Sequence, residues 1–218
     1  MSDTTASYGQ AKYQVRFDWG AAGAQRILHG AHLVVLVDAL SYTTSAVVVA
    51  EQGAVPDATT ARAVDAAAPG DAHAAALAAS VAATGVVVLA ASLRNRAAVA
   101  DHILAVQERR GERTTVAIVA VGEPEPVGGG TRFTIEDQLT AGAVVDALVG
   151  LGIDHTSPEA AVASAAFEGL RQAIVHLVAA SGSGIALTAA GRRAEVRLAT
   201  ERDVTRVVPE WRDGAFRI

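Results

Sequence analysis

The 218-residue sequence contains no cysteine. This absence excludes disulfide bonds, thiolate metal sites and a cysteine nucleophile. Lysine is nearly absent too, because every basic residue except Lys12 is an arginine. The 18 basic and 23 acidic residues give a formal net charge of −5, so the chain lacks the basic excess that is typical of nucleic-acid-binding proteins. We therefore expect no nucleic-acid partner.

Long apolar segments are also lacking. No apolar run approaches the roughly 20 residues that a membrane-spanning helix needs. Residues 1–10, MSDTTASYGQ, do not contain the apolar centre of a signal peptide. The sequence therefore predicts a soluble, cytoplasmic protein without a membrane partner.

Several metal and nucleotide motifs are missing as well. The six histidines show no H-x-x-x-H spacing, which disfavours a zinc site. No G-x-G-x-x-G follows a predicted strand, which disfavours a dinucleotide site. The glycines at 128–130 are not followed by the GK[ST] of a phosphate-binding loop, so we interpret them as a flexible connection.

Short apolar runs rich in valine are present at 33–37, 85–90 and 114–121. Such runs are typical of strands that are buried on both faces. Because predicted helices alternate with them, the sequence favours an α/β fold, a layered α/β/α sandwich with a mostly parallel or mixed sheet. We expect the strands 33–37, 86–89 and 116–121 near the centre of that sheet. We also expect one domain over residues 1–218, either undivided or built as two small lobes.

The remaining elements are predicted from caps, periodicity and turn residues. Hydroxyl residues after Asp38 predict a helix that begins near Thr43 and ends before Gly53. Further helices are expected at 19–29, 60–68, 72–83, 95–110, 134–148 and 158–180, with Pro69-Gly70 as a turn between the second and third of these. A half-exposed strand is expected at 12–18, and short strands are expected in the tail segments EVRLAT, VTRVVPEW and GAFRI.

Five segments together resemble the 2-phosphosulfolactate phosphatase (ComB-like) family. They are VVLVDALSYTTS, AASLRNRAAVA, TVAIVAVGE, FTIEDQLTAGAVVDAL and RDVTRVVPEW, which occur in the family's order and cover most of the chain. The resemblance implies an α/β/α phosphatase that depends on Mg²⁺ and acts on a small anionic phosphorylated substrate. It leaves open whether the chain forms a homo-oligomer.

The chain also departs from the family's pattern. Ser41 stands where the family usually has an arginine, and three polar elements of the family's middle segment have no counterpart in the alanine-rich stretch 57–84. The chain is therefore similar to a divergent and shortened member, and we expect weak or altered activity and poor turnover of phosphosulfolactate. The alternative is a catalytically degenerate member that binds a small anion or a protein partner.

Carboxylates at predicted strand and helix ends are the candidate catalytic and metal-binding residues. Asp38 ends the strand 33–37, and Glu136 and Asp137 open the helix 134–148. Mg²⁺ commonly takes one or two carboxylates together with water and substrate phosphate, so these residues could bind it if the two ends are neighbours. Asp38 equally suits a turn cap, and Glu136 and Asp137 suit any first helical turn.

Polar residues near the same segments are the candidates for substrate binding. They are Ser41, Thr43, Thr44, Arg94 and Asn95. Each has a structural alternative, because hydroxyl and amide side chains often cap helices and arginines often lie on the surface. Arg94 or Arg132 could replace the missing family arginine from a neighbouring loop.

Overall fold

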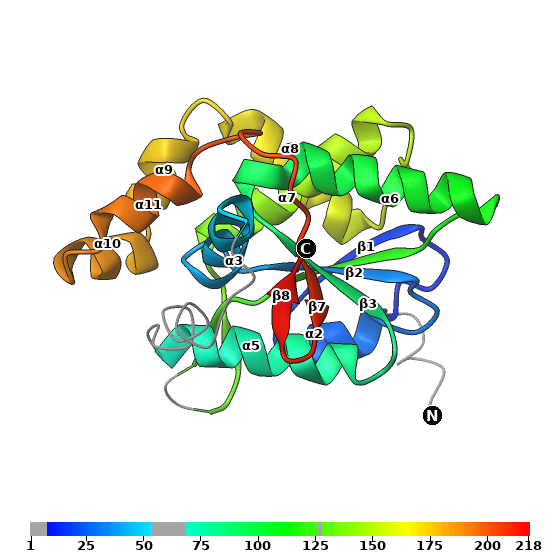
Figure 1. The fold of residues 1–218 in the computed structure, drawn as a ribbon, viewed down its shortest axis with the longest axis horizontal. Helices are drawn as coiled ribbons and strands as arrows, with labels where there is room; N and C mark the ends of the chain where they lie inside the picture. Colours follow the sequence, from blue (N-terminus) through cyan, green and yellow to red (C-terminus); the bar gives the residue numbers. More distant parts are fainter. Residues whose placement is uncertain (1–7, 54–68, 126–127) are drawn as a thin grey trace.

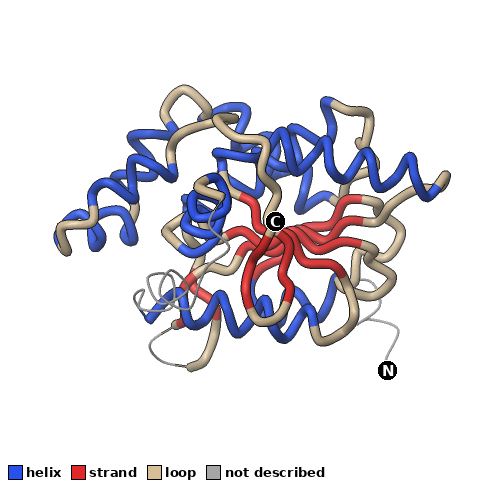
Figure 2. Tube along the Cα trace, viewed as in Figure 1, coloured by secondary structure: helices blue, strands red, loops and turns tan. Residues whose placement is uncertain are grey.

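The computed structural model describes residues 8–53, 69–125 and 128–218, and its centre is a mixed six-stranded sheet (Figures 1 and 2). The strand order is β1-β4-β2-β3-β7-β8. The first four strands in this order are parallel, and β7 and β8 continue the sheet antiparallel. The strands are β1 (Val15–Trp19), β2 (Leu33–Val37), β3 (Val87–Ala91), β4 (Val116–Ala120), β7 (Glu210–Arg212) and β8 (Ala215–Arg217), and a separate two-stranded sheet pairs β5 (Glu123–Pro124) with β6 (Thr131–Arg132).

Helices cover both faces of the six-stranded sheet. The helices are α2 (Gly20–Ile27), α3 (Tyr42–Glu51), α5 (Pro69–Ala82), α6 (Arg96–Arg110), α7 (Ile135–Gly150), α8 (Pro158–Leu170), α9 (Ile174–Ala180), α10 (Gly182–Ala189) and α11 (Arg193–Ala199), with a 3₁₀ turn η1 (Leu93–Asn95) before α6. Figure 1 shows α6, α7 and α8 above the sheet, α2 and α5 below it, and α9, α10 and α11 together at one end. None of the helices within the described ranges is long and apolar enough to cross a membrane.

The central strands are buried on both faces, as predicted. In β2, Val35 and Val37 belong to the core under α6, α7 and α8, whereas Val34 and Leu36 belong to the core on the side of α2 and α5. Successive side chains of a strand point to opposite faces, so a strand between two helical layers needs apolar residues at every position. The α/β sandwich and the central position of these strands are therefore confirmed.

The first strand differs from the prediction. It begins at Val15, and its first three residues are buried, including Arg16. The Arg16 guanidinium donates hydrogen bonds to the backbone carbonyls of Tyr13, Ile27 and His29. The hydrogen bonds of the charged side chain are thus satisfied inside the protein. The alternation of polar and apolar residues in this strand therefore does not mark a solvent-exposed face of the sheet.

Two predictions about the helices were also wrong in part. Pro69-Gly70 is not a turn but the beginning of α5, because proline suits the first turn of a helix; the helix predicted at 60–68 lies outside the described residues. The helix predicted at 158–180 is divided at 171–173 into α8 and α9, so that Ile174 and Val178 pack with Leu139 of α7 while Leu170 is exposed.

The tail contains more helix than expected. EVRLAT belongs to α11, because Val196 and Ala199 are buried with a spacing of three residues rather than two. VTRVVPEW is extended into the sheet only from Glu210, directly after Pro209.

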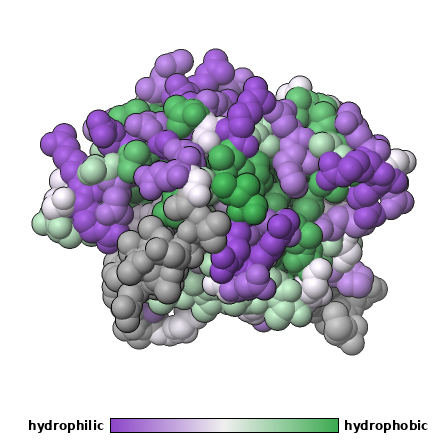
Figure 3. Space-filling model, in the orientation of Figure 1, coloured by the Kyte–Doolittle hydropathy of each residue, from purple (hydrophilic) through white to green (hydrophobic). Residues whose placement is uncertain are grey.

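Figure 3 shows hydrophilic side chains gathered over the free end of α6, where residues 108–110 are exposed.

Candidate active site

A cavity of about 520 Å³ lies where β2 and β4 end and α7 begins. Asp38 follows β2, Gly122 follows β4, and Glu136 and Asp137 are in the first turn of α7. Residues of α10 and the turn before α11 close the other side. The structure thus brings four predicted residues into one cavity lining, namely Asp38, Ser41, Glu136 and Asp137. This position, beyond the carboxyl ends of parallel strands, is where open α/β sheets generally bind ligands.

Asp38 is fixed by the turn between β2 and α3. The Thr43 hydroxyl accepts a hydrogen bond from the Asp38 N–H at 3.0 Å and donates one to the Asp38 carbonyl at 2.8 Å. The Tyr42 N–H donates to Asp38 Oδ1 at 3.4 Å. The hydroxyl-rich sequence after Asp38 therefore holds its backbone while its carboxylate lines the cavity.

Asp137 joins three segments at the bottom of the cavity. Its Oδ1 accepts a hydrogen bond from the Ala39 N–H at 2.7 Å, and its Oδ2 accepts from the Gly122 N–H at 3.0 Å and from the Thr134 hydroxyl at 2.8 Å. Burial and the negative charge of Glu136 raise the pKa of Asp137 to about 7, although these three hydrogen bonds act in the opposite direction. One carboxylate thus connects the ends of β2 and β4 to the beginning of α7.

Glu136 differs from its neighbour in having no such partners. Its exposed fraction is 2 %, and it lines the cavity. No described residue donates a hydrogen bond to it or forms an ion pair with it, although its charge acts on Asp137 and on Arg132. A buried carboxylate without a close donor is unfavourable unless a cation balances it.

Another side of the cavity, here called the acidic wall, is formed by Glu123 of β5 and Ser183 of α10. The Glu123 carboxylate accepts hydrogen bonds from Arg132 and from the Ser183 hydroxyl. Burial opposes the ionisation of Glu123, but the two hydrogen bonds and the positive charge of Arg132 outweigh it and lower its pKa. Glu123 is therefore ionised at neutral pH.

Arg192 supplies a cation that the sequence did not indicate. It lies in the turn before α11, lines the cavity, and its Nη2 is 3.4 Å from the hydroxyl of Ser41, which is 151 residues away in the chain. The same guanidinium binds Glu195 through Nε and Nη2, at 2.6 and 2.7 Å. Ser41, where the resemblance led us to expect an arginine, thus has the guanidinium of Arg192 beside it.

The other predicted substrate-binding residues lie outside this cavity lining. Thr43 and Thr44 are buried, and their hydroxyls bind the backbone carbonyls of Asp38 and Ala39. Asn95 accepts a hydrogen bond from the Ser92 N–H and donates to the carbonyls of Ala90 and Val207. Their polar groups are thus used within the fold.

Arg94 is likewise engaged away from the cavity. Its guanidinium pairs with Glu51 of α3 and with Glu201 after α11, and its Nη1 is 3.5 Å from the carbonyl oxygen of Leu198. It therefore connects three parts of the fold rather than lining the cavity.

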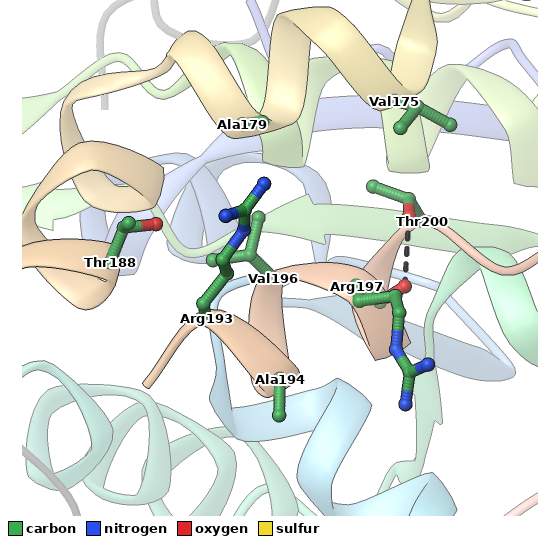
Figure 4. Close-up of a pocket in the computed structure, with 8 residues that line it drawn as sticks. All are labelled: Val175, Ala179, Thr188, Arg193, Ala194, Val196, Arg197 and Thr200. Carbon is green, nitrogen blue, oxygen red and sulfur yellow. Dashed lines mark hydrogen bonds between the residues drawn. The ribbon is translucent and has the colours of Figure 1, made fainter. Parts of the chain in front are cut away.

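A different cavity, of about 430 Å³, lies between α9, α10 and α11 (Figure 4). Figure 4 shows Arg193 extending from the beginning of α11 toward α9, with Val196 beside it and the guanidinium of Arg197 pointing away. Its lining contains no carboxylate of the described residues and none of the predicted catalytic residues. The cavity at the carboxyl ends of the strands is therefore the candidate active site.

The carboxylates around that cavity do not form a complete metal cage. No group of three or more His, Asp or Glu side chains in residues 8–53, 69–125 and 128–218 is arranged to hold a metal ion. Mg²⁺ does not require one, because it usually keeps several waters and binds through one or two carboxylates and substrate phosphate. The donor set, which is composed of carboxylate oxygens with one unpartnered carboxylate, fits Mg²⁺ on those terms.

Comparison with known proteins identifies the family. No curated protein matches the chain. The family model described as 2-phosphosulpholactate phosphatase matches residues 71–214, which is more than half of the chain. The match includes Glu123, Glu136, Asp137 and Arg192 and begins after the turn that carries Asp38 and Ser41. The chain therefore belongs to the 2-phosphosulfolactate phosphatase family.

Proposed function

We propose that this protein is a phosphatase that hydrolyses a small anionic phosphate monoester with Mg²⁺ in the cavity between Asp38, Glu136 and Arg192. The observation that carries the proposal is Glu136, which is buried, lines the cavity and has no hydrogen-bond or ion-pair partner among the described residues. Removing an ionised carboxylate from water without a counterion is strongly unfavourable. A bound cation would balance this charge.

Glu136 and Asp38 are the residues that would hold the ion. When bound, Mg²⁺ would neutralise charge on phosphoryl oxygens and lower the pKa of an attacking water. Asp137 is better suited to positioning, because its two oxygens already accept three hydrogen bonds. It keeps Glu136 and the turn of Asp38 at fixed places on the cavity wall.

Arg192 and Ser41 are the groups of this cavity that suit the phosphate of the substrate. A guanidinium gives charge-assisted hydrogen bonds to phosphate oxygens, and the Ser41 hydroxyl beside it can donate another. In the reaction a water oxygen forms a bond to phosphorus, the bond between phosphorus and the ester oxygen breaks, and a proton from the water passes to the leaving alcohol. The protein's contribution is to orient the ester and to offset the charge of its phosphoryl oxygens.

Calorimetric titration of the metal-free protein with MgCl₂ tests the metal site. We expect binding by the wild type and at least about tenfold weaker binding by Glu136→Gln, since even loss of an outer partner of a metal ligand commonly costs that much. Asp38→Asn should also bind more weakly. Glu125→Gln is the matched control, because Glu125 is exposed on the neighbouring hairpin and is not in the cavity lining. Equal affinity of the wild type and Glu136→Gln would contradict the proposed site.

Release of inorganic phosphate from a panel of small esters, with and without Mg²⁺, tests the activity. Turnover that requires Mg²⁺ and falls in Glu136→Gln supports the phosphatase. Binding of Mg²⁺ and phosphate without turnover of any ester would support the alternative, a catalytically degenerate member that binds a small anion. That alternative is favoured by Ser41, which stands where the resemblance implies an arginine.

A further inference from the structure

The cavity is lined by more acidic than basic groups. Asp38, Glu123, Glu136 and Asp137 face it, and Arg192 is the one cation among the described lining residues. Arg192 already binds the carboxylate of Glu195 with two nitrogen atoms. Arg132 lies next to the wall and already pairs with Glu123.

This distribution of charge limits what the organic part of a substrate can carry. Mg²⁺ with Glu136 and Asp38, and Arg192 with Ser41, account for the phosphate group. No further cation remains among the described lining residues for a second anionic group such as a carboxylate or a sulfonate. Such a group would instead meet Glu123, whose lowered pKa keeps it ionised. Like charges repel each other there, although solvent and the ion pair with Arg132 weaken the repulsion.

The wall around Glu123 is nevertheless polar and can form hydrogen bonds. The Glu123 carboxylate can accept from hydroxyl groups, and the Ser183 hydroxyl that now donates to it can donate to a ligand instead. Rejection of a competitor by repulsion, combined with attraction of the preferred ligand, is a common basis of specificity. A cavity of about 520 Å³ accommodates a small molecule of this kind.

We infer that the site selects phosphate monoesters whose organic part is uncharged and carries hydroxyl groups, and that Glu123 determines this selectivity. The inference rests on the proposed function, because it concerns the second half of the same substrate. It places phosphosulfolactate, whose organic part carries both a sulfonate and a carboxylate, among the poor substrates of this protein.

Two esters with the same carbon skeleton provide the test. Glycerol 3-phosphate and 3-phosphoglycerate differ in that a hydroxymethyl group of the first is a carboxylate in the second. We expect kcat/KM for glycerol 3-phosphate to exceed that for 3-phosphoglycerate by on the order of tenfold or more, as expected for one like charge near the acidic wall. Glu123→Gln should reduce this ratio several-fold, mainly by lowering KM for 3-phosphoglycerate, and added salt should reduce the wild-type ratio.

Glu125→Gln is again the control, because it removes the same charge two residues away without changing the cavity lining. Thermal unfolding of Glu123→Gln monitors the fold, and the glutamine carbonyl can still accept from Arg132. Hydrolysis with 3-phosphoglycerate equal to or better than glycerol 3-phosphate, or an unchanged ratio in Glu123→Gln, would overturn the inference and leave the phosphatase intact. Absence of phosphate release from both esters and from p-nitrophenyl phosphate would overturn the proposed function and this inference with it.

Discussion

At the scale of single residues, the site depends on two adjacent carboxylates in opposite surroundings. Asp137 accepts three hydrogen bonds, whereas Glu136 accepts none from the described residues. Both are buried, so their negative charges oppose each other in a medium that screens them poorly. Asp137 therefore retains its proton more readily than an exposed carboxyl group would.

The first prediction concerns this proton in the metal-free protein. Burial and the charge of Glu136 raise the pKa of Asp137 to about 7, from an ordinary value of 3.8. Because the folded state then binds more protons than the unfolded chain between about pH 4 and pH 7, the free energy of unfolding should fall as the pH rises through this range. Glu136→Gln removes the second cause and should lower the pKa of Asp137 and flatten the pH dependence.

Carbon-13 NMR of the aspartate carboxyl groups measures this pKa directly, with a chelator present. Urea unfolding at several pH values measures the slope, and Glu125→Gln should leave both unchanged. A pKa of Asp137 below 4 in the wild type would show that its three hydrogen bonds outweigh burial.

The sequence could predict some of these residues for a simple reason. Asp38 and the pair at 136 and 137 follow or precede long apolar segments, and the carboxyl ends of parallel strands meet at one edge. Arg192 could not be predicted, because it is 151 residues from Ser41 in the chain. Its place beside Ser41 depends on how α10 and α11 pack in the folded protein. Nothing in its local sequence distinguishes it from Arg193, which lines a different cavity.

At the scale of whole elements, the close crossing of α7 and α8 depends on one glycine. A Cβ atom at Gly142 would lie 2.0 Å from the backbone carbonyl oxygen of Ala163, and a backbone atom cannot move aside as a side chain does. Gly142→Ala should therefore reduce the free energy of unfolding by about 3 kcal/mol or more. Because Glu136 and Asp137 begin the same helix, Mg²⁺ affinity should fall as well.

Gly150→Ala is the matched control at the other end of α7, where a Cβ atom would meet no neighbour within 4 Å. Alanine favours helix, so this variant should be neutral or more stable by up to about 1 kcal/mol. Urea denaturation of both variants decides between the two expectations. Equal stability of Gly142→Ala and the wild type would mean that α7 and α8 can separate without loss.

Element boundaries show what local sequence could and could not reveal. Apolar runs identified β2, β3 and β4, because burial between two helical layers leaves little choice of residue. The break between α8 and α9 was missed, since its cause is the packing of Ile174 and Val178 against α7 rather than a glycine or proline in the chain. The helix α11 was missed for a similar reason, because a short apolar segment fits either period.

At the scale of the whole molecule, Arg94 links the helical group of α9, α10 and α11 to the sheet. Its side chain is 8 % exposed and joins η1 to Glu51 of α3 and to Glu201 after α11. Arg192 directly precedes α11, so the position of the cavity's cation depends on this attachment. Resemblance to the family suggested a substrate contact for Arg94, whereas the structure places its guanidinium between two carboxylates.

The last prediction separates these two roles. Arg94→Met keeps much of the apolar stem but leaves Glu51 and Glu201 without their partner, and we expect a loss of about 2–3 kcal/mol in the free energy of unfolding. This is below the roughly 3–5 kcal/mol for breaking a fully buried pair, because both glutamates are partly exposed. Arg206→Met, whose side chain is 90 % exposed and pairs with Asp101, should stay within about 0.5 kcal/mol of the wild type.

Activity and metal binding complete the comparison. If Arg94 acts through α11, its variant should lose kcat/KM because Arg192 is less well placed, while Mg²⁺ affinity at Glu136 stays within about twofold of the wild type, since α7 is anchored separately by Asp137. Amide hydrogen exchange should then increase in α11 and not in β2 or β4. If instead KM rises with unchanged stability and unchanged exchange in α11, Arg94 contacts the substrate, and the attachment of the helical group does not depend on it.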